Sequence, residues 1–203
     1  MKERFEIKSQ AKASFLAQYW TCVVMSAAYA VLVSVVSGAT FGVAAFLLMP
    51  PLSVGYAYFN LRIYRGEAGD VVEAFAAGFK DYGKSLVGIL WTYLFTFLWS
   101  LLFLIPGIVK ALAYSMTPYI LTDMPNVTAK DALRVSMKMT DGHKGEIFMM
   151  ALSFLGWWLL TGLTFGILAF FYTGPYTATS FAGLYEELKK NALEKNLLGG
   201  DAL

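Results

Sequence analysis

The chain has 203 residues, of which 58% are hydrophobic and only 15% are charged. Soluble domains carry about 25% charged residues, so this composition excludes an ordinary water-soluble fold and favours a membrane protein. The formal net charge of +2 is too small to indicate a nucleic-acid partner. The single cysteine, Cys22, lies in an apolar run. It excludes a disulfide framework and favours a small buried side chain.

The first residues, Met1–Lys12, mix acids and bases and carry Phe5 and Ile7 as apolar points. This pattern predicts either a short amphipathic helix on the inner membrane surface or a solvated, frayed terminus. This terminus leads into a long apolar run without a small-residue A-x-A cleavage site, so we expect no cleavable signal peptide.

Six apolar segments follow, and each is predicted to be a transmembrane helix, because about 20 residues cross the hydrocarbon core. Their ranges are roughly Phe15–Val36, Phe41–Tyr64, Ser85–Ile105, Gly107–Thr122, Ile147–Leu160 and Ile167–Leu184. They form hairpins over residues 13–64, 85–122 and 147–185, followed by a cytoplasmic tail over 186–203. We therefore expect an all-α fold, a single polytopic transmembrane domain over residues 1–203.

Prolines interrupt two of these segments. Pro50 and Pro51 remove amide donors inside the second segment and predict either a packing kink or a helix broken around a ligand. Pro106-Gly107 predicts a turn before the fourth segment, which is too short for a full crossing. Either Asp123 and Met124 extend that segment, the turn dips into the bilayer, or the membrane is thinner there.

The connections between the hairpins are polar and predict amphipathic interfacial helices. Val71–Gly83 has apolar residues at helical spacing, which favours a helix along the membrane surface. Thr128 and Asp131 form a capping-box pattern that begins a second helix, and Asp141-Gly142 ends it.

The basic residues fall on one side of this arrangement. They are Lys2, Arg4, Lys8, Lys12, Arg62, Arg65, Lys80, Lys84, Lys130, Arg134, Lys138, Lys144, Lys189, Lys190 and Lys195. The connections within the hairpins carry no charge, and Lys110 alone lies within a segment. The positive-inside rule then predicts that both termini are cytoplasmic.

The first and third hairpins share a sequence pattern that predicts a parallel internal repeat. At one fixed offset, Gly38, Thr40, Phe41, Gly42, Ala45, Phe46 and Pro51 recur as Gly162, Thr164, Phe165, Gly166, Ala169, Phe170 and Pro175. The glycine pairs are spaced for close helix approach, although glycines of an ordinary turn would give the same pattern.

Four stretches together carry a family resemblance. They are MPPLSVGYAYFNLRIYRGE, LWSLLFLIPGIVKALAYSMTPYILTD, ALRVSMKMTDGHKG and the C-terminal SFLGWW with FAGLYEEL. With them the chain resembles the bacterial integral membrane family catalogued as domain of unknown function nine hundred and seventy-five. The resemblance implies a six-helix protein of the bacterial cytoplasmic membrane without an established reaction. More distantly, the chain resembles the membrane domain of some glycerophosphodiester phosphodiesterases, which points towards lipids.

Lys110 is the main candidate for a ligand contact. It lies only about 6 Å past Pro106 at 1.5 Å per residue, so its stem can reach the interface as a simple anchor. The alternative is a contact to a lipid phosphate or anionic substrate at the outer leaflet. Further candidates of the same kind are Tyr114, Ser115, Pro118, Tyr119, Pro175 and Tyr176.

His143, Lys144 and Lys84 are candidate cytoplasmic contacts to lipid headgroups. A single histidine without cysteine or histidine neighbours does not form a zinc site, and no nucleophile, base and acid fall together. We therefore expect no catalytic residue, no metal and no cofactor.

Two hypotheses of function remain from the sequence. The first is a non-enzymatic membrane protein that handles or transports a lipid or other amphiphile. The second is a structural, regulatory or permease-like subunit of a larger membrane complex, in which the chain pairs with itself or with another membrane subunit. A continuous polar cavity favours the first, and a sealed core with a free apolar flank favours the second.

Overall fold

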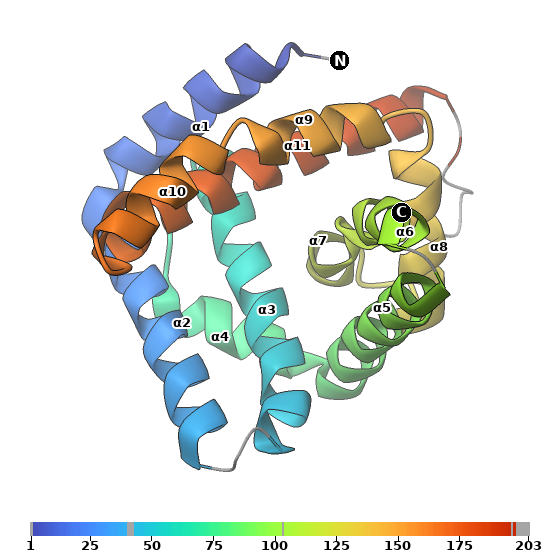
Figure 1. Ribbon diagram of the computed structural model, residues 1–203, viewed down its shortest axis with the longest axis horizontal. Helices are drawn as coiled ribbons and strands as arrows, with labels where there is room; N and C mark the ends of the chain where they lie inside the picture. The colour runs from blue at the N-terminus through green and yellow to red at the C-terminus, as the bar shows by residue number, and fades with distance from the viewer. Residues whose placement is uncertain (1, 40–42, 103, 196, 198–203) are drawn as a thin grey trace.

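The computed structural model describes residues 2–39, 43–102, 104–195 and 197, and these residues form an all-helical fold without strands. The α-helices are α1 (Arg4–Ala17), α2 (Tyr19–Ala39), α3 (Val43–Tyr64), α4 (Val71–Lys80), α5 (Tyr82–Leu102), α6 (Leu104–Tyr114), α7 (Thr117–Asp123), α8 (Ala129–Thr140), α9 (Lys144–Leu152), α10 (Leu155–Leu163) and α11 (Gly174–Glu194). A π-helix, η1 (Ala169–Thr173), precedes α11. Figure 1 shows α2, α3 and α5 extending away from a layer that contains α1 and α9–α11.

Helix α1 is ordered along the predicted amphipathic stretch. A capping box between Glu3 and Glu6 begins it, which satisfies amide donors that the first turn leaves open. Its apolar side, formed by Ile7, Ala11 and Phe15, is buried, and the helix packs on α11. The apolar side of α1 therefore faces protein, and the alternative of a frayed terminus is wrong.

The first apolar segment does not begin at Phe15 as a straight helix. Phe15 belongs to α1, and the chain bends by 92° between α1 and α2. Gln18 lies at this bend, where its side-chain amide donates to the Glu67 carbonyl at 2.6 Å and accepts from the Gly69 N–H at 2.8 Å. This pair of hydrogen bonds fixes the bend to the loop that follows α3.

Helix α3 continues through both Pro50 and Pro51, so the alternative of a helix broken there is wrong. Its second half is the centre of the core and contacts α2, α4, α7 and α11. Helix α4, predicted to lie along the membrane surface, packs closely against α3, and its position relative to the membrane stays a prediction. Its Gly78 lies so close to Gly55 that a Cβ on Gly78 would be 2.8 Å from the Gly55 nitrogen. Two glycines thus allow a helix contact that the periodicity of α4 does not reveal.

The predicted turn at Pro106-Gly107 is also wrong, because both residues lie inside α6. Pro106 is the third residue of that helix, where amide groups have no intrahelical acceptor and proline costs little. The fourth apolar segment is instead divided after Tyr114, and α7 begins at Thr117. Pro118 in the first turn of α7 lacks the amide that would continue α6, which explains the division.

The last two apolar segments are divided as well. The fifth forms α9 and α10, and the sixth forms η1 and α11, with Pro175 in the first turn of α11. Helix α11 extends to Glu194 with Leu188 and Ala192 buried, so the first part of the predicted tail is packed. Pro51 lies in the middle of α3 whereas Pro175 begins α11, so these repeat positions differ locally. Thr40, Phe41 and Gly42 lie outside the described residues, and the repeat stays a prediction.

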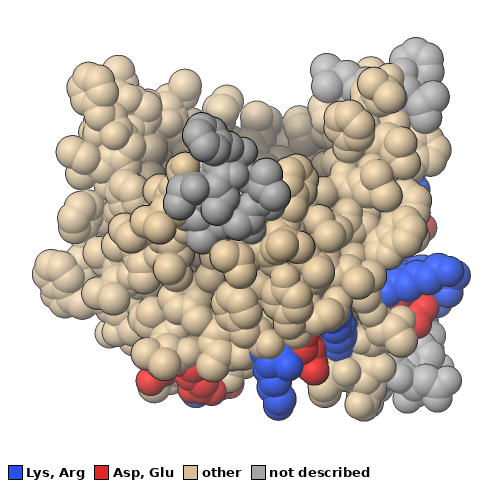
Figure 2. Space-filling model, turned by 90° about the horizontal axis from the view of Figure 1, so that it is seen from below, with Lys and Arg blue, Asp and Glu red and all other residues tan. Residues whose placement is uncertain are grey.

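Two stretches, Tyr82–Leu101 and Lys144–Leu163, are long and apolar enough to cross a membrane. The bent pair of α1 with the first part of α2 gives a third if it is counted as one span. Large apolar side chains are exposed on these helices, among them Leu101 at 74% and Leu163 at 76%. In Figure 2 the charged residues gather along the lower edge and right side of the face, below a broad uncharged surface. Such exposure is typical of a surface covered by lipid. Six crossings stay a prediction.

Candidate functional site: a groove between α1 and α9

A groove of about 870 Å³ lies between α1 and α9. The residues that line it are Lys2, Glu3, Arg4, Phe5, Ile7, Lys8, Gly145, Glu146, Met149, Met150, Leu152, Ser153 and Leu184. Four of the five charged lining residues lie in residues 2–8, and α9 contributes three apolar residues, Met149, Met150 and Leu152. The groove is therefore amphipathic, and its size is that of a small-molecule site.

Arg4 and Lys8 lie one helical turn apart on the wall that α1 contributes. The Arg4 Nη1 atom donates to the Met149 carbonyl at 3.2 Å, and the Lys8 Nζ atom donates to Ser153 Oγ at 3.1 Å. Lys8 Nζ also lies 4.1 Å from the centre of the Phe154 ring. Among the described residues, neither cation forms an ion pair with a carboxylate. Both positive charges on this wall are thus held by neutral partners.

The opposite wall and the rim are apolar. Met149 and Leu152 of α9 are each nearly half exposed, and Phe5 of α1 is 80% exposed. The carboxylate of Glu146, also in the groove, lies 3.2 Å from His143 Nδ1. The groove therefore combines free apolar surface with cations whose charge is not neutralised.

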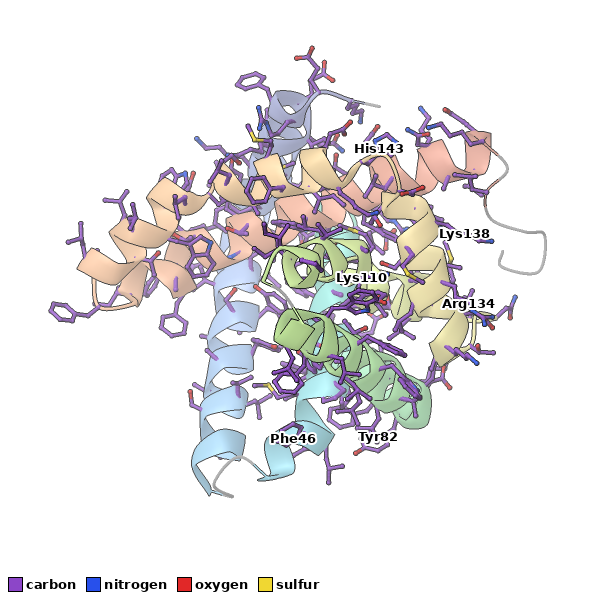
Figure 3. The ribbon with its side chains drawn as sticks, turned by 45° about the vertical axis from the view of Figure 1, so that its right-hand side comes forward. Phe46, Tyr82, Lys110, Arg134, Lys138 and His143 are labelled. Carbon is purple, nitrogen blue, oxygen red and sulfur yellow. The ribbon has the colours of Figure 1, made fainter. Side chains whose placement is uncertain are left out.

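Lys110, the main candidate from the sequence, lies elsewhere. Its Nζ atom is 3.9 Å from Met137 Sδ on α8, 5.1 Å from the Trp99 ring and 5.9 Å from the Tyr114 ring. Figure 3 shows Lys110 on the side of α6 that faces α8, the helix that also carries Arg134 and Lys138. The structure thus brings Lys110 and Tyr114 together and places them beside a basic helix. The Ser115 hydroxyl instead donates to the Leu112 carbonyl.

The remaining ligand candidates are divided between two other places. Pro118 lies in the first turn of α7, and the neighbouring Tyr119 is buried and stacks on Tyr185 with ring centres 5.4 Å apart. Pro175 begins α11, and Tyr176 packs against Phe154 at 5.1 Å. Lys8 lies 5.8 Å from the Tyr176 ring, so Tyr176 alone of this set lies next to the groove.

The candidate headgroup contacts form three separate local arrangements. Lys84 Nζ donates to the carbonyls of Met124 and Pro125. His143 lies between Glu146 and Asn191, with each ring nitrogen 3.2 Å from its neighbour. Lys144 pairs with Asp141 at 3.3 Å. Each side chain thus has a protein partner, and the three do not converge on one position.

A partly buried ionic network, centred on the buried Asp123 side chain, joins α7 and α11 to Arg65 at the end of α3. The Asp123 carboxylate pairs with Arg65 at 2.7 Å and Lys189 at 2.6 Å, and Tyr185 Oη donates to it at 2.8 Å. Arg65 also pairs with Glu186 at 2.7 Å. Burial alone raises the pKa of Asp123, but the hydrogen bonds from Lys189, Arg65 and Tyr185 outweigh it and hold the pKa below its ordinary value. This network ties α7 and the end of α3 to α11, which contacts α1 and contributes Leu184 to the groove.

The groove residues Arg4, Lys8, Met149 and Leu152 were not among the candidates from the sequence. The available signal was the four-residue spacing of Arg4 and Lys8, with Phe5 between them on the same turn. That spacing does not reveal that α9 lies opposite, because residues about 145 positions apart make the contact.

Comparison with known proteins finds one family match, over part of the chain. No curated protein and no solved structure matches the chain. Helix α9 lies inside the stretch that the family match covers, and α1 lies outside it. The resemblance described from the sequence is confirmed, because residues 101–192 match the family described as "Protein of unknown function (DUF975)".

Proposed function

We propose that this protein is a non-enzymatic, multi-pass protein of the bacterial cytoplasmic membrane that handles or transports a lipid or other amphiphile. The groove between α1 and α9 carries the proposal, because it offers apolar surface and unpaired cations side by side. In this proposal the six apolar segments lie in the bilayer as three hairpins. The basic residues and both termini face the cytoplasm, as the positive-inside rule requires.

The alternative is a structural or permease-like subunit that associates through its exposed apolar helices. Its support is the exposed surface of α2, α5 and α10. A bilayer covers such a surface equally well, so this observation does not favour a protein partner over lipid. The groove, in contrast, has a defined shape and a polarity that suits one kind of occupant.

Photo-crosslinking of the reconstituted protein tests the proposal. The probe is a phospholipid that carries a diazirine in one acyl chain. We expect crosslinks on peptides that cover residues 2–8 and 145–153, and we expect Leu152→Trp to reduce them because the indole fills the groove. Leu159→Trp on α10, where Leu159 is 65% exposed, is the matched control and leaves these crosslinks unchanged. Crosslinks confined to α2, α5 and α10, or unaffected by Leu152→Trp, would contradict the proposal.

A further inference from the structure

The groove contains two cations, Arg4 and Lys8, that form no ion pair with a carboxylate among the described residues. Arg4 and Lys8 stand four residues apart on α1, a spacing at which like charges repel. Their donors reach only a backbone carbonyl and a hydroxyl, at 3.2 and 3.1 Å. An anion between the two cations would form charge-assisted hydrogen bonds with both and would reduce their repulsion.

The carboxylates nearest to this pair have other partners. Glu146 lies 3.2 Å from His143 Nδ1. Glu187 accepts from the Lys2 backbone at 3.0 Å and pairs with its ammonium. Glu3 and Glu6 close the capping box at the start of α1. Among the described residues, none of these carboxylates forms an ion pair with Arg4 or Lys8, so both cations can accept an anionic ligand.

The apolar part of the groove limits what that anion can be. A free inorganic ion would leave Phe5, Met149 and Leu152 exposed, whereas a molecule with an apolar tail covers them. The guanidinium of Arg4 matches two phosphate oxygens, and Lys8 adds a point charge one turn further along. The Ser153 hydroxyl accepts from Lys8 and donates its one proton to the Met150 carbonyl at 2.6 Å, so Arg4 and Lys8 are the groups left to hold the phosphate.

We propose that the groove binds a lipid with an anionic phosphate headgroup, whose phosphate is held by Arg4 and Lys8 and whose acyl chain lies against Met149 and Leu152. This inference rests on the proposed function, since it names the class of amphiphile that the groove takes. It adds a preference for an anionic phosphate headgroup, which the proposed function does not require.

Native mass spectrometry of the full chain in detergent measures this specificity. The probes are phosphatidylglycerol and a diacylglycerol with the same acyl chains, which lacks the phosphate. We expect phosphatidylglycerol to bind about tenfold more tightly, and Arg4→Gln with Lys8→Gln to remove about that factor. Lys12→Gln with Lys130→Gln removes the same charge from exposed positions outside the groove and leaves the preference intact. Lys8→Arg keeps the positive charge and should retain the preference for phosphatidylglycerol.

The outcomes separate the inference from the proposed function. If Arg4→Gln with Lys8→Gln and Lys12→Gln with Lys130→Gln reduce the preference for phosphatidylglycerol equally, the preference reflects general electrostatic attraction and the inference is overturned. Equal binding of the two lipids, with groove crosslinks still present, would overturn the inference and leave the proposed function standing. Absence of groove crosslinks would remove the proposed function. Leu152→Trp fills the apolar part of the groove and should block lipid binding. If this variant still binds inorganic phosphate, and millimolar phosphate displaces bound phosphatidylglycerol, the groove is a site for a free anion and the lipid assignment is overturned. Thermal melts confirm that each variant folds.

Discussion

Gly78 of α4 lies directly against Gly55 of α3, and neither position has room for a side chain. A Cβ on Gly55 would be 2.6 Å from the Ala74 carbonyl oxygen, and one on Gly78 would be 2.8 Å from the Gly55 nitrogen. Both obstacles are backbone atoms, which cannot turn aside as a flexible side chain can. The close packing of α3 and α4 therefore depends on these two residues.

We expect Gly78→Ala to destabilise the protein by about 2 kcal/mol, because the new methyl group forces the two helices apart. A thermal melt in detergent should show a decrease of about 5 °C. Gly83→Ala in α5 is the control, since a Cβ there meets nothing within 4 Å. It should leave the melting temperature unchanged or raise it slightly. Equal effects of the two substitutions would show that the helix contact is looser than described.

The Asp123 network predicts a second stability effect. Asp123→Asn keeps the shape of the side chain but leaves Arg65 and Lys189 without their carboxylate, which should cost about 3 kcal/mol at pH 7. Asp141→Asn is the control, because the Asp141 side chain is 79% exposed and pairs only with Lys144. An exposed pair of this kind contributes less than about 1 kcal/mol. Chemical denaturation or thermal melting distinguishes the two variants.

The same network predicts the direction of a pH effect. The folded pKa of Asp123 lies below its ordinary value of 3.8, so the unfolded chain binds a proton more readily than the folded chain. Stabilisation by Asp123 is therefore complete above about pH 4 and is lost as the pH falls through the lower folded pKa. The stability difference between wild type and Asp123→Asn should narrow below pH 4. A difference that stays constant down to pH 2 would contradict this assignment.

Lys110 predicts a local effect on lipid contact. Its ammonium has a sulfur and two aromatic rings as neighbours and no carboxylate among the described residues. We expect Lys110→Gln to weaken contact with anionic lipid about fivefold and Lys110→Arg largely to spare it. Quenching of Trp99 fluorescence by brominated phosphatidylglycerol, in a variant with Trp99 as its only tryptophan, measures this contact. Equal effects of Gln and Arg would mean that Lys110 acts as an anchor only.

Cysteine labelling in whole cells tests the proposed orientation. The native Cys22 is 1% exposed and should not react with a membrane-impermeant maleimide. We expect Lys138→Cys on α8 to react only after the cells are permeabilised and Gly162→Cys on α10 to react in intact cells. A Cys22→Ala background removes any residual native signal. Labelling of Lys138→Cys in intact cells would show that α8 faces outward, opposite to the proposed orientation.

The parts of the fold that local sequence determines were predictable. Apolar composition indicated a helical membrane protein, and the structure contains helices with the length and polarity to span a bilayer. The helix predicted to begin after Thr128 does so at Ala129, and Thr128 Oγ1 accepts from the Asp131 amide. Such signals depend on residues three or four positions apart, which a single sequence displays directly.

The parts that distant residues determine were not predictable. The bend at Gln18 depends on a loop about 50 residues later, and the packing of α4 against α3 depends on the match of Gly78 to Gly55. The groove is harder still to predict from the sequence, because it forms only when α1 packs on α11 and α9 lies opposite α1. Nothing in Met1–Lys12 specifies which helix will face Arg4. The site therefore became visible only in three dimensions, while Lys110 was conspicuous in the sequence.

The hydrogen bonds of Gln18 anchor the C-terminal end of α1 to the loop that follows α3. Helix α1 has 14 residues, so its far end lies about 20 Å from Gln18 at 1.5 Å per residue. A rotation of about 10° at Gln18 would carry Arg4 by about 3–4 Å, roughly the width of one acyl chain. The Gln18 amide, which accepts from the Gly69 N–H, thereby fixes how far the basic wall of the groove stands from α9.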